Sequence, residues 1–218
     1  MFRMSFKTKK YEVLKQAIPK SLANFIFNYL LIQRGAVDYL VKKNQTNPFN
    51  PFIGTREDQQ VPGCYSKYGD WAMEALLMQL LPLMIKKTGL KLIPTYTYMR
   101  IYEKGNILRR HKDRPSCEIS TTLNLGGDPW PIFLDPTGQT FVIDEFKQIH
   151  KPNAPKGIKV NLDPGDMLIY SGCDLEHWRE PFEGEACAQV FLHYNNGNGP
   201  FGKDNLYDKR PILGIPKS

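Results

Sequence analysis

Cysteine, histidine and long apolar runs are all scarce in this chain, and each scarcity excludes a class of protein. The four cysteines include no Cys-x-x-Cys pair, which argues against a structural zinc site and against a disulfide framework. No apolar run approaches the roughly 20 residues of a transmembrane helix, and the N-terminal MFRMSFKTKK lacks the apolar stretch of a signal peptide. We therefore expect a soluble cytoplasmic protein with reduced, mostly packed thiols.

Length and composition indicate one domain. A chain of 218 residues with 41% hydrophobic and 12% aromatic residues can bury a single substantial core. The sequence contains neither an internal repeat nor a low-complexity tract. We divide the predicted domain, residues 1–218, into helical support with a loop (1–90), a β-rich core (91–195) and a C-terminal tail (196–218).

The net charge of +7 is unevenly distributed along the chain. Residues 1–60 hold 10 Lys and Arg against 4 Asp and Glu, and residues 86–114 hold 9 against 2. Residues 117–218 reverse the sign, with 9 basic and 14 acidic side chains. The basic half could attract an acidic partner or nucleic acid. Because no interleaved aromatic and basic motif accompanies it, an ordinary solvated surface is the preferred interpretation.

Two segments have the apolar spacing of helices. SLANFIFNYLLIQRGAVDYLVKK begins at Ser21, a plausible N-cap, and DWAMEALLMQLLPLMIKKTG begins at the capping residue Asp70 and ends before Gly89. Pro82 predicts a kink in the second helix. Residues 44–69 are polar and rich in Gly, Pro and Asn, so they predict a long loop that could act as a lid.

The pattern changes to short β-like runs after Lys91. These runs are rich in β-branched and aromatic residues and are separated by Gly, Pro and Asp turns. They read TYTYMRIY, EISTTLNL, PIFLD, TFVID, GIKVNL, DMLIY, EHWRE and CAQVFLHY. The order of elements predicts an α+β chain, mainly β, with a sandwich or barrel built on helical support.

His111 and Asp113 form a His-x-Asp pair, and a third metal ligand can be sought among the remaining histidines. His150 lies in a Pro-containing surface loop, whereas His177 begins a strand at the mouth of the predicted barrel. Two histidines and one carboxylate leave three positions of an octahedral Fe(II) open. Zinc fits less well, because structural zinc closes its shell, often with thiolates.

Two segments resemble the metal-ligand regions of Fe(II)/2-oxoglutarate oxygenases of the prolyl-4-hydroxylase-like branch: YTYMRIYEKGNILRRHKD and LDPGDMLIYSGCDLEHWREPF. The resemblance implies a double-stranded β-helix, jelly-roll or cupin-like, with N-terminal supporting helices. It implies Fe(II) held by His111, Asp113 and His177, with 2-oxoglutarate and O2 as cosubstrates, and Tyr102 in contact with 2-oxoglutarate. It further implies hydroxylation, since halogenating relatives carry a small residue at the carboxylate position.

One departure from this pattern concerns the far carboxylate of 2-oxoglutarate. The family places a basic residue on the last core strand, where this chain has Gln189, which we include among the candidate contacts. Arg179 is the nearest alternative, because strand alternation puts it on the same face as His177. A salt bridge between Arg179 and neighbouring glutamates is the rival interpretation. Arg114 is the second candidate, and Arg110 is expected to face solvent or the substrate entrance.

The remaining aromatic and histidine residues have simpler expected roles. Trp178 should point outward and pack, Trp130 could border the cleft or pack at a strand edge, and His193 should support the site without binding metal. The resemblance favours a prolyl or other side chain of a protein or peptide as the substrate, with a small molecule also possible. Oxidative demethylation of nucleic acid and a catalytically silent β-barrel binding module are the alternatives.

Overall fold

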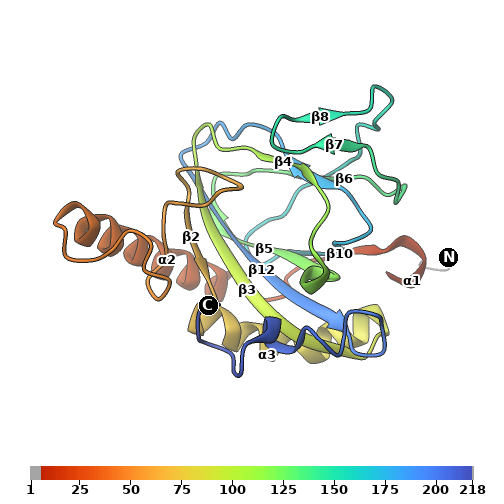
Figure 1. Cartoon of the computed structure of the whole chain (residues 1–218), viewed down its shortest axis with the longest axis horizontal. Coiled ribbons are helices and arrows are strands. Elements are labelled where there is room, and N and C mark those ends of the chain that lie inside the picture. The colour runs from red at the N-terminus through yellow and green to blue at the C-terminus, as the bar shows by residue number, and fades with distance from the viewer. Residues whose placement is uncertain (1–5, 218) are drawn as a thin grey trace.

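Two antiparallel sheets face each other in the computed structural model, which describes residues 6–217 (Figure 1). The larger sheet has the strand order β1-β10-β5-β12-β3-β2 and the smaller sheet the order β4-β11-β6-β9. The bounds of the larger sheet's strands are β1 Tyr11–Leu14, β2 Tyr65–Tyr68, β3 Leu92–Glu103, β5 Ile119–Gly127, β10 Met167–Ser171 and β12 Ala186–Asn196. Those of the smaller sheet are β4 Leu108–His111, β6 Ile132–Leu134, β9 Ile158–Val160 and β11 His177–Arg179.

The larger sheet is backed by helices. Its outer face packs against α2 (Lys20–Lys42) and α3 (Trp71–Thr88), which together with the sheet bury the main apolar core. The expected cap of α3 is confirmed, since the Asp70 carboxylate accepts hydrogen bonds from the first-turn amides, and Gly89 ends the helix with a φ of 67°. Ser21 is not the N-cap of α2, because the helix already begins after Pro19.

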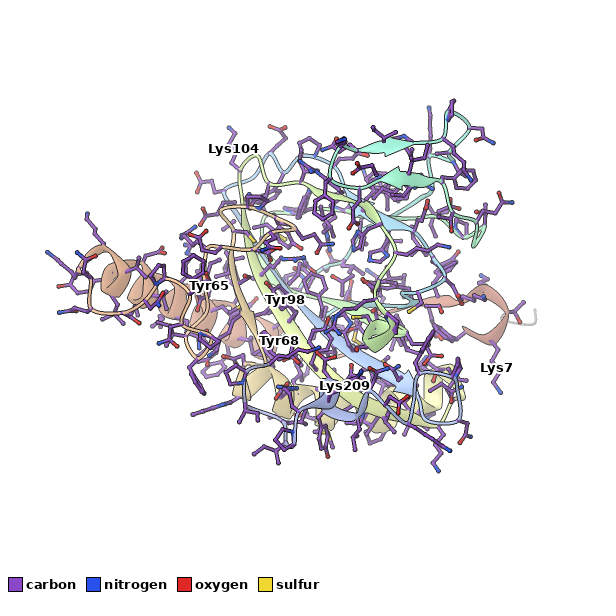
Figure 2. All side chains as sticks on the ribbon, viewed as in Figure 1. Lys7, Tyr65, Tyr68, Tyr98, Lys104 and Lys209 are labelled. Atoms are coloured by element: carbon purple, nitrogen blue, oxygen red, sulfur yellow. The ribbon has the colours of Figure 1, made fainter. Side chains whose placement is uncertain are left out.

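All eight β-like runs form strands, and the structure adds four strands that the sequence did not predict: β1, β2, β4 and β8 (Ile149–His150). Residues 44–69 are therefore not entirely loop, since β2 pairs with β3 and places Tyr68 opposite Tyr98 (Figure 2). The hairpin of β7 (Val142–Asp144) and β8 stands apart from both sheets. The short elements are α1 Phe6–Lys9, η1 Pro115–Cys117 and η2 Leu206–Lys209.

Strands of the larger sheet carry buried polar side chains, among them Arg100, Thr122 and Gln189. Cross-strand partners on β3 and β12 share a face, and the pair Arg100 and Gln189 is one of them. On the smaller sheet His111 pairs with His177, whereas Arg179 pairs with Leu108, so the register shifts between the two pairs. Apolar clusters fill the remaining space between the sheets.

Within residues 6–217, no helix combines the length and apolar character needed to cross a membrane.

Candidate metal centre

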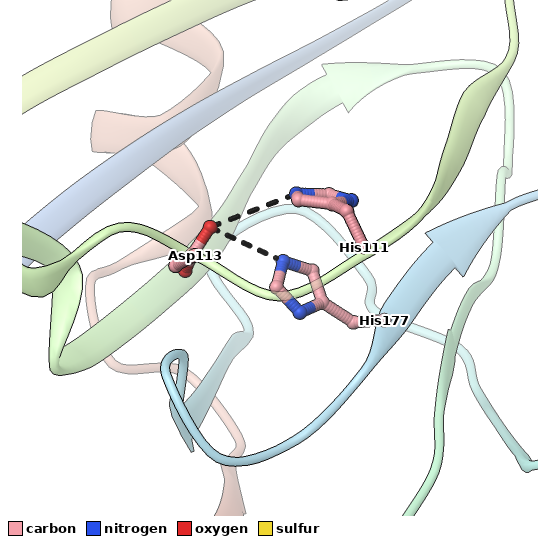
Figure 3. A group of neighbouring side chains, drawn as sticks. All are labelled: His111, Asp113 and His177. Carbon is pink, nitrogen blue, oxygen red and sulfur yellow. Dashed lines mark ion pairs between the residues drawn. The ribbon is translucent and has the colours of Figure 1, made fainter. Parts of the chain in front are cut away.

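The structure brings His111, Asp113 and His177 together between the sheets (Figure 3). His111 ends β4, His177 begins β11, and Asp113 follows β4 by two residues. The Oδ1 atom of Asp113 lies 3.6 Å from Nε2 of His111 and 3.5 Å from Nε2 of His177. Both histidines are buried. Three ligand atoms of the expected type therefore surround one point.

Backbone carbonyls orient both imidazoles. Nδ1 of His111 lies 2.7 Å from the carbonyl oxygen of Arg109, and Nδ1 of His177 lies 3.0 Å from that of Leu175. A carbonyl oxygen can only accept, so each Nδ1 must carry the proton, which leaves the Nε2 lone pair free. Metal-binding histidines are commonly held in this way. The residues present therefore fit a divalent metal ion.

The Asp113 carboxylate is held by both of its oxygens. While Oδ1 faces the histidines, Oδ2 accepts a 2.6 Å hydrogen bond from the Ser120 hydroxyl. The backbone amide of Asp113 donates to the carbonyl of Gly172, and a Cβ atom at residue 172 would collide with Oδ2. Burial raises the pKa of Asp113, but the two imidazoles, when protonated, outweigh it and hold that pKa well below its ordinary value. A bound cation takes over this role when the Nε2 atoms are free. The carboxylate is thus ionised and ready to bind a cation.

An ion-pair network on the opposite face of the smaller sheet ties the two histidine strands together. Arg110 donates to Glu176, at 2.7 Å, and to Asp135, and both carboxylates are fully buried. Arg110 also stacks on Trp178. The expectation that Arg110 faces solvent or the substrate entrance was wrong, because its side chain is only 10% exposed. Arg110 and Glu176 are the chain neighbours of the two histidines, so this network supports the strand pairing beside the site.

A cavity of about 160 Å³ opens onto the triad. Besides the triad it is lined by Gln60, Tyr96, Tyr98, Arg100, Leu108, Tyr170, Phe191 and His193. Arg100 is buried, and its guanidinium pairs with Asp58 through contacts of 2.6 and 3.2 Å. It also donates to the side-chain oxygen of Gln60. The cavity wall next to residues 44–69 is therefore polar, but Asp58 neutralises the positive charge of Arg100.

Arg179 is almost completely buried and has no carboxylate partner among residues 6–217, so the rival glutamate salt bridge does not form. It reaches across to the larger sheet, where Nη2 donates to Thr122 at 3.2 Å, while Nη1 donates to the carbonyl of Trp130. Its Nε atom has no partner, and burial lowers the pKa of Arg179. Arg179 does not line the triad cavity but lies beyond its wall, two residues along β11 from His177. An uncompensated buried cation of this kind calls for an anion.

The other candidate contacts lie in different surroundings. Arg114 does not line the cavity: its guanidinium lies over the ring of Tyr96 and pairs with Asp208 at 2.7 Å. Gln189 bonds to Thr122 and Asn124, next to the Arg179 guanidinium. Tyr102 is buried, and its ring packs against Trp130. The structure thus groups Gln189 and Tyr102 with Arg179, and separates Arg114 from them.

The remaining expectations can be placed in the structure. Trp178 stacks on Phe133 on the outer face of the smaller sheet, as expected from alternation. Trp130 packs in the apolar cluster between the sheets. His150 is exposed, in β8. His193 lies against the site, with Nδ1 3.0 Å from Ser120 Oγ, and burial lowers its pKa to about 4.

Three residues beside the triad were missed from the sequence: Ser120, Gly172 and Arg100. Arg100 had a readable signal, since strand alternation in TYTYMRIY places it on the face of Tyr102. Ser120 and Gly172 carried none, because a serine in a strand and a glycine in a turn are common everywhere. Their contacts with Asp113 depend on how β5 and the turn after β10 meet.

No model of a known protein family matches the chain, and no curated protein matches it in sequence. Solved structures do match. A Pseudomonas putida prolyl-4-hydroxylase aligns with a TM-score of 0.55 and 15% identity over 88% of this chain and 95% of its own. EctD from S. alaskensis, with 2-oxoglutarate and 5-hydroxyectoine, aligns at 0.61 and 14% over 98% and 85%.

HygX from Streptomyces hygroscopicus, with nickel and 2-oxoglutarate bound, aligns with a TM-score of 0.57 and 12% identity over 88% of this chain and 85% of its own. At sequence identities this low, these structural alignments establish the shared fold alone. The chain therefore has the double-stranded β-helix fold with helical support, as the sequence resemblance implied.

Proposed function

We propose that this protein is an Fe(II)- and 2-oxoglutarate-dependent oxygenase that hydroxylates an unactivated C–H bond, with succinate and CO2 as coproducts. The triad carries the proposal, because His111 and His177 present free Nε2 atoms to one oxygen of Asp113 inside a double-stranded β-helix. Two nitrogen ligands and one carboxylate on one side of a metal are typical of non-haem Fe(II) oxygenases. A silent binding module would have no need of a buried, preorientated triad.

His111, Asp113 and His177 would hold the iron. When bound, Fe(II) supplies the redox chemistry that couples decarboxylation of 2-oxoglutarate to oxygen insertion. The protein's own part is to direct both Nδ1–H groups at backbone carbonyls and to hold Asp113 through Ser120, so that all three ligands are ready to bind without rearrangement. Tyr170 packs against His177 with its ring centroid 4.6 Å away, which limits movement of that ligand.

Arg179 would bind the far carboxylate of 2-oxoglutarate, with Thr122, Gln189 and Tyr102 around it. The supporting observation is charge balance. Arg179 is buried without an acid, whereas Arg100 is neutralised by Asp58. Along a strand, two residues span about 6.6 Å, so Arg179 stands one inward position from His177. A dicarboxylate that reached both would satisfy the unpaired guanidinium.

We place the substrate among prolyl or other side chains of proteins and peptides, or small molecules of similar size. The prolyl-4-hydroxylase-like motif around His111 supports the first, and the structural likeness to EctD with 5-hydroxyectoine supports the second. Nucleic acid is disfavoured, because acidic residues of the C-terminal part neutralise some of the basic excess: Lys15 pairs with Asp166, and Arg110 pairs with Asp135.

A cytoplasmic location belongs to the same proposal. All four cysteines are free thiols, three of them buried and Cys173 half-buried. A reducing compartment preserves thiols and ferrous iron alike. Native disulfides in the isolated protein would argue against this location.

The test is anaerobic Fe(II) titration followed by succinate measurement across peptide, amino-acid and nucleic-acid pools. We expect one Fe(II) per chain, and succinate only with iron, 2-oxoglutarate and oxygen together. The His111→Ala, His177→Ala double variant should lose both Fe(II) binding and succinate formation. His150→Ala, at an exposed histidine, is the matched control. Full iron binding by the double variant would refute the assignment.

A further inference from the structure

Ser120 stands between Asp113 and His193 and touches both. Its Oγ atom lies 2.6 Å from Oδ2 of Asp113, 3.0 Å from Nδ1 of His193 and 3.0 Å from the carbonyl oxygen of Cys117. Ser120 and His193 are both buried. Water therefore cannot easily replace the hydrogen bond of Ser120 to Asp113 or to His193.

The single hydroxyl proton of Ser120 decides the direction of these bonds. A carboxylate that binds a metal is deprotonated and can only accept. The 2.6 Å separation between Ser120 Oγ and Asp113 Oδ2 is shorter than the 3.0 Å from Ser120 Oγ to the Cys117 carbonyl or to His193, and it is that of a charge-assisted bond. If Ser120 donated to His193 instead, two oxygen atoms would face each other at 2.6 Å without a proton. The Ser120 proton therefore lies on the Asp113 side, and Nδ1 of His193 must donate to Ser120.

We propose that His193 is a positioning residue, which acts through Ser120 to hold Asp113 as a one-oxygen ligand. The relay runs from His193 Nδ1–H to Ser120 Oγ–H to Asp113 Oδ2, and it leaves Oδ1 alone to face the histidines. This inference rests on the proposed function, and it extends that function to two residues that do not touch the metal.

Three further contacts support the relay. The His193 ring packs on Tyr96 with centroids 4.5 Å apart, which fixes its plane. Gly172 leaves room for Oδ2 to reach Ser120, since a side chain there would collide with both atoms. His193 and Ser120 are also direct cross-strand partners on β12 and β5, so the sheet register maintains their contact.

A second metal site formed by Asp113, Cys117 and His193 is the competing interpretation, because their ligand atoms lie within 4.8 Å of one another. Two contacts oppose it. The thiol of Cys117 is bonded to the Tyr96 hydroxyl at 2.9 Å, and Nδ1 of His193 is bonded to Ser120. Asp113, moreover, turns its free oxygen towards His111 and His177.

Co(II) binding to the purified full-length protein tests the relay without a substrate. The titration would follow the visible d–d absorption of Co(II), with thermal unfolding of each metal-free variant alongside. Ser120→Ala removes the relay, and Ser120→Thr retains the hydroxyl. His193→Phe retains the ring on Tyr96 without a donor, whereas His193→Asn retains a donor near the position of Nδ1.

We expect Ser120→Ala to weaken Co(II) binding by about 10- to 100-fold, as outer contacts of metal ligands typically do. His193→Phe should act in the same direction, and the Thr and Asn variants should stay close to the parent. The double variant Ser120→Ala, His193→Phe should bind no more weakly than Ser120→Ala alone, because both changes break one chain of bonds.

Several results would overturn the relay. Parent-like affinity of Ser120→Ala is one, and independent, multiplying effects in the double variant are another. A change of Co(II) coordination number in His193→Phe, or two Co(II) ions per chain, would show that His193 is itself a metal ligand. If the parent bound no Co(II), the proposed function would fall and the relay with it. If the parent bound Co(II) and the variants bound it equally well, the relay alone would fall.

Discussion

Replacing Arg179 with methionine separates a ligand anchor from a structural arginine. Methionine keeps much of the apolar volume and removes the charge. The change loses two hydrogen bonds, to Trp130 and Thr122, each with a net value of about 0.5–1.5 kcal/mol. It also removes a buried cation that has no acidic partner, whose desolvation costs several kcal/mol. We therefore expect the metal-free variant to unfold at or above the parent's temperature.

The same change should weaken 2-oxoglutarate binding. Loss of a charge-assisted hydrogen bond of this type costs about 1.5–3 kcal/mol, or about one to two powers of ten in Kd. Calorimetric titration of the anaerobic Fe(II)-loaded protein with 2-oxoglutarate measures it. Fe(II) affinity should be unchanged, since Arg179 contacts none of the triad.

Arg100 and Arg114 are the matched controls. Arg100→Met breaks a buried ion pair with Asp58 and should destabilise the protein by about 3–5 kcal/mol. Arg114→Met should leave 2-oxoglutarate binding unchanged, because its guanidinium is held by Asp208. If Arg179→Met bound 2-oxoglutarate like the parent, and either control lost binding while folded, the anchor would be that other arginine.

The remaining predictions concern metal geometry, acid stability and nucleic acid. Gly172→Ala should weaken Co(II) binding by about tenfold or more, because its methyl group would displace Asp113 Oδ2; Gly35→Ala, at a helical site with open space, should not. Burial raises the pKa of Asp208, but Arg114 outweighs it and holds that pKa below its ordinary value, so this carboxylate stabilises the fold above its unfolded pKa and stops doing so as the pH falls. Asp208→Asn should therefore lower the urea midpoint at neutral pH, and the difference in midpoint between variant and parent should become smaller in acid. A difference in midpoint that does not change with pH would contradict this. Oligonucleotide binding, followed by anisotropy, should be weak, and tight salt-sensitive binding that stimulates succinate release would favour a demethylase.

The strands and the triad could be read from the sequence because both depend on local pattern. Alternating runs with turn residues between them predicted eight strands, and a His-x-Asp pair needs only its own spacing. β4 was missed because Leu108–His111 is four residues long and three of them are basic or polar, so no alternation is visible. The N-terminus of α2 was misplaced because Pro19, without a side-chain cap, already allows the helix to begin.

The surroundings of the triad could not be read, because they depend on residues far apart in the chain. Arg114 meets Asp208 across 94 residues, and Ser120 meets His193 across 73. Arg179 was placed inward correctly from alternation, but its lack of an acidic partner became visible only once every carboxylate had a position. Contacts of this kind follow from sheet order and register, which composition does not determine.

The shifted register between β4 and β11 makes the site depend on a residue count as well as on residue identity. Three steps along β4, from Leu108 to His111, match two steps along β11, from Arg179 to His177. This extra residue lets both Leu108 and His111 face the cavity while Arg110 turns to the opposite side. A regular ladder over the same four residues, without the bulge, would turn one of these two side chains outward, because residues three apart on a regular strand lie on opposite faces. A substitution that straightened β4 could thus turn His111 away from Asp113 and His177 while leaving all three residues in the sequence, and a search for the three residues would still score such a chain as intact.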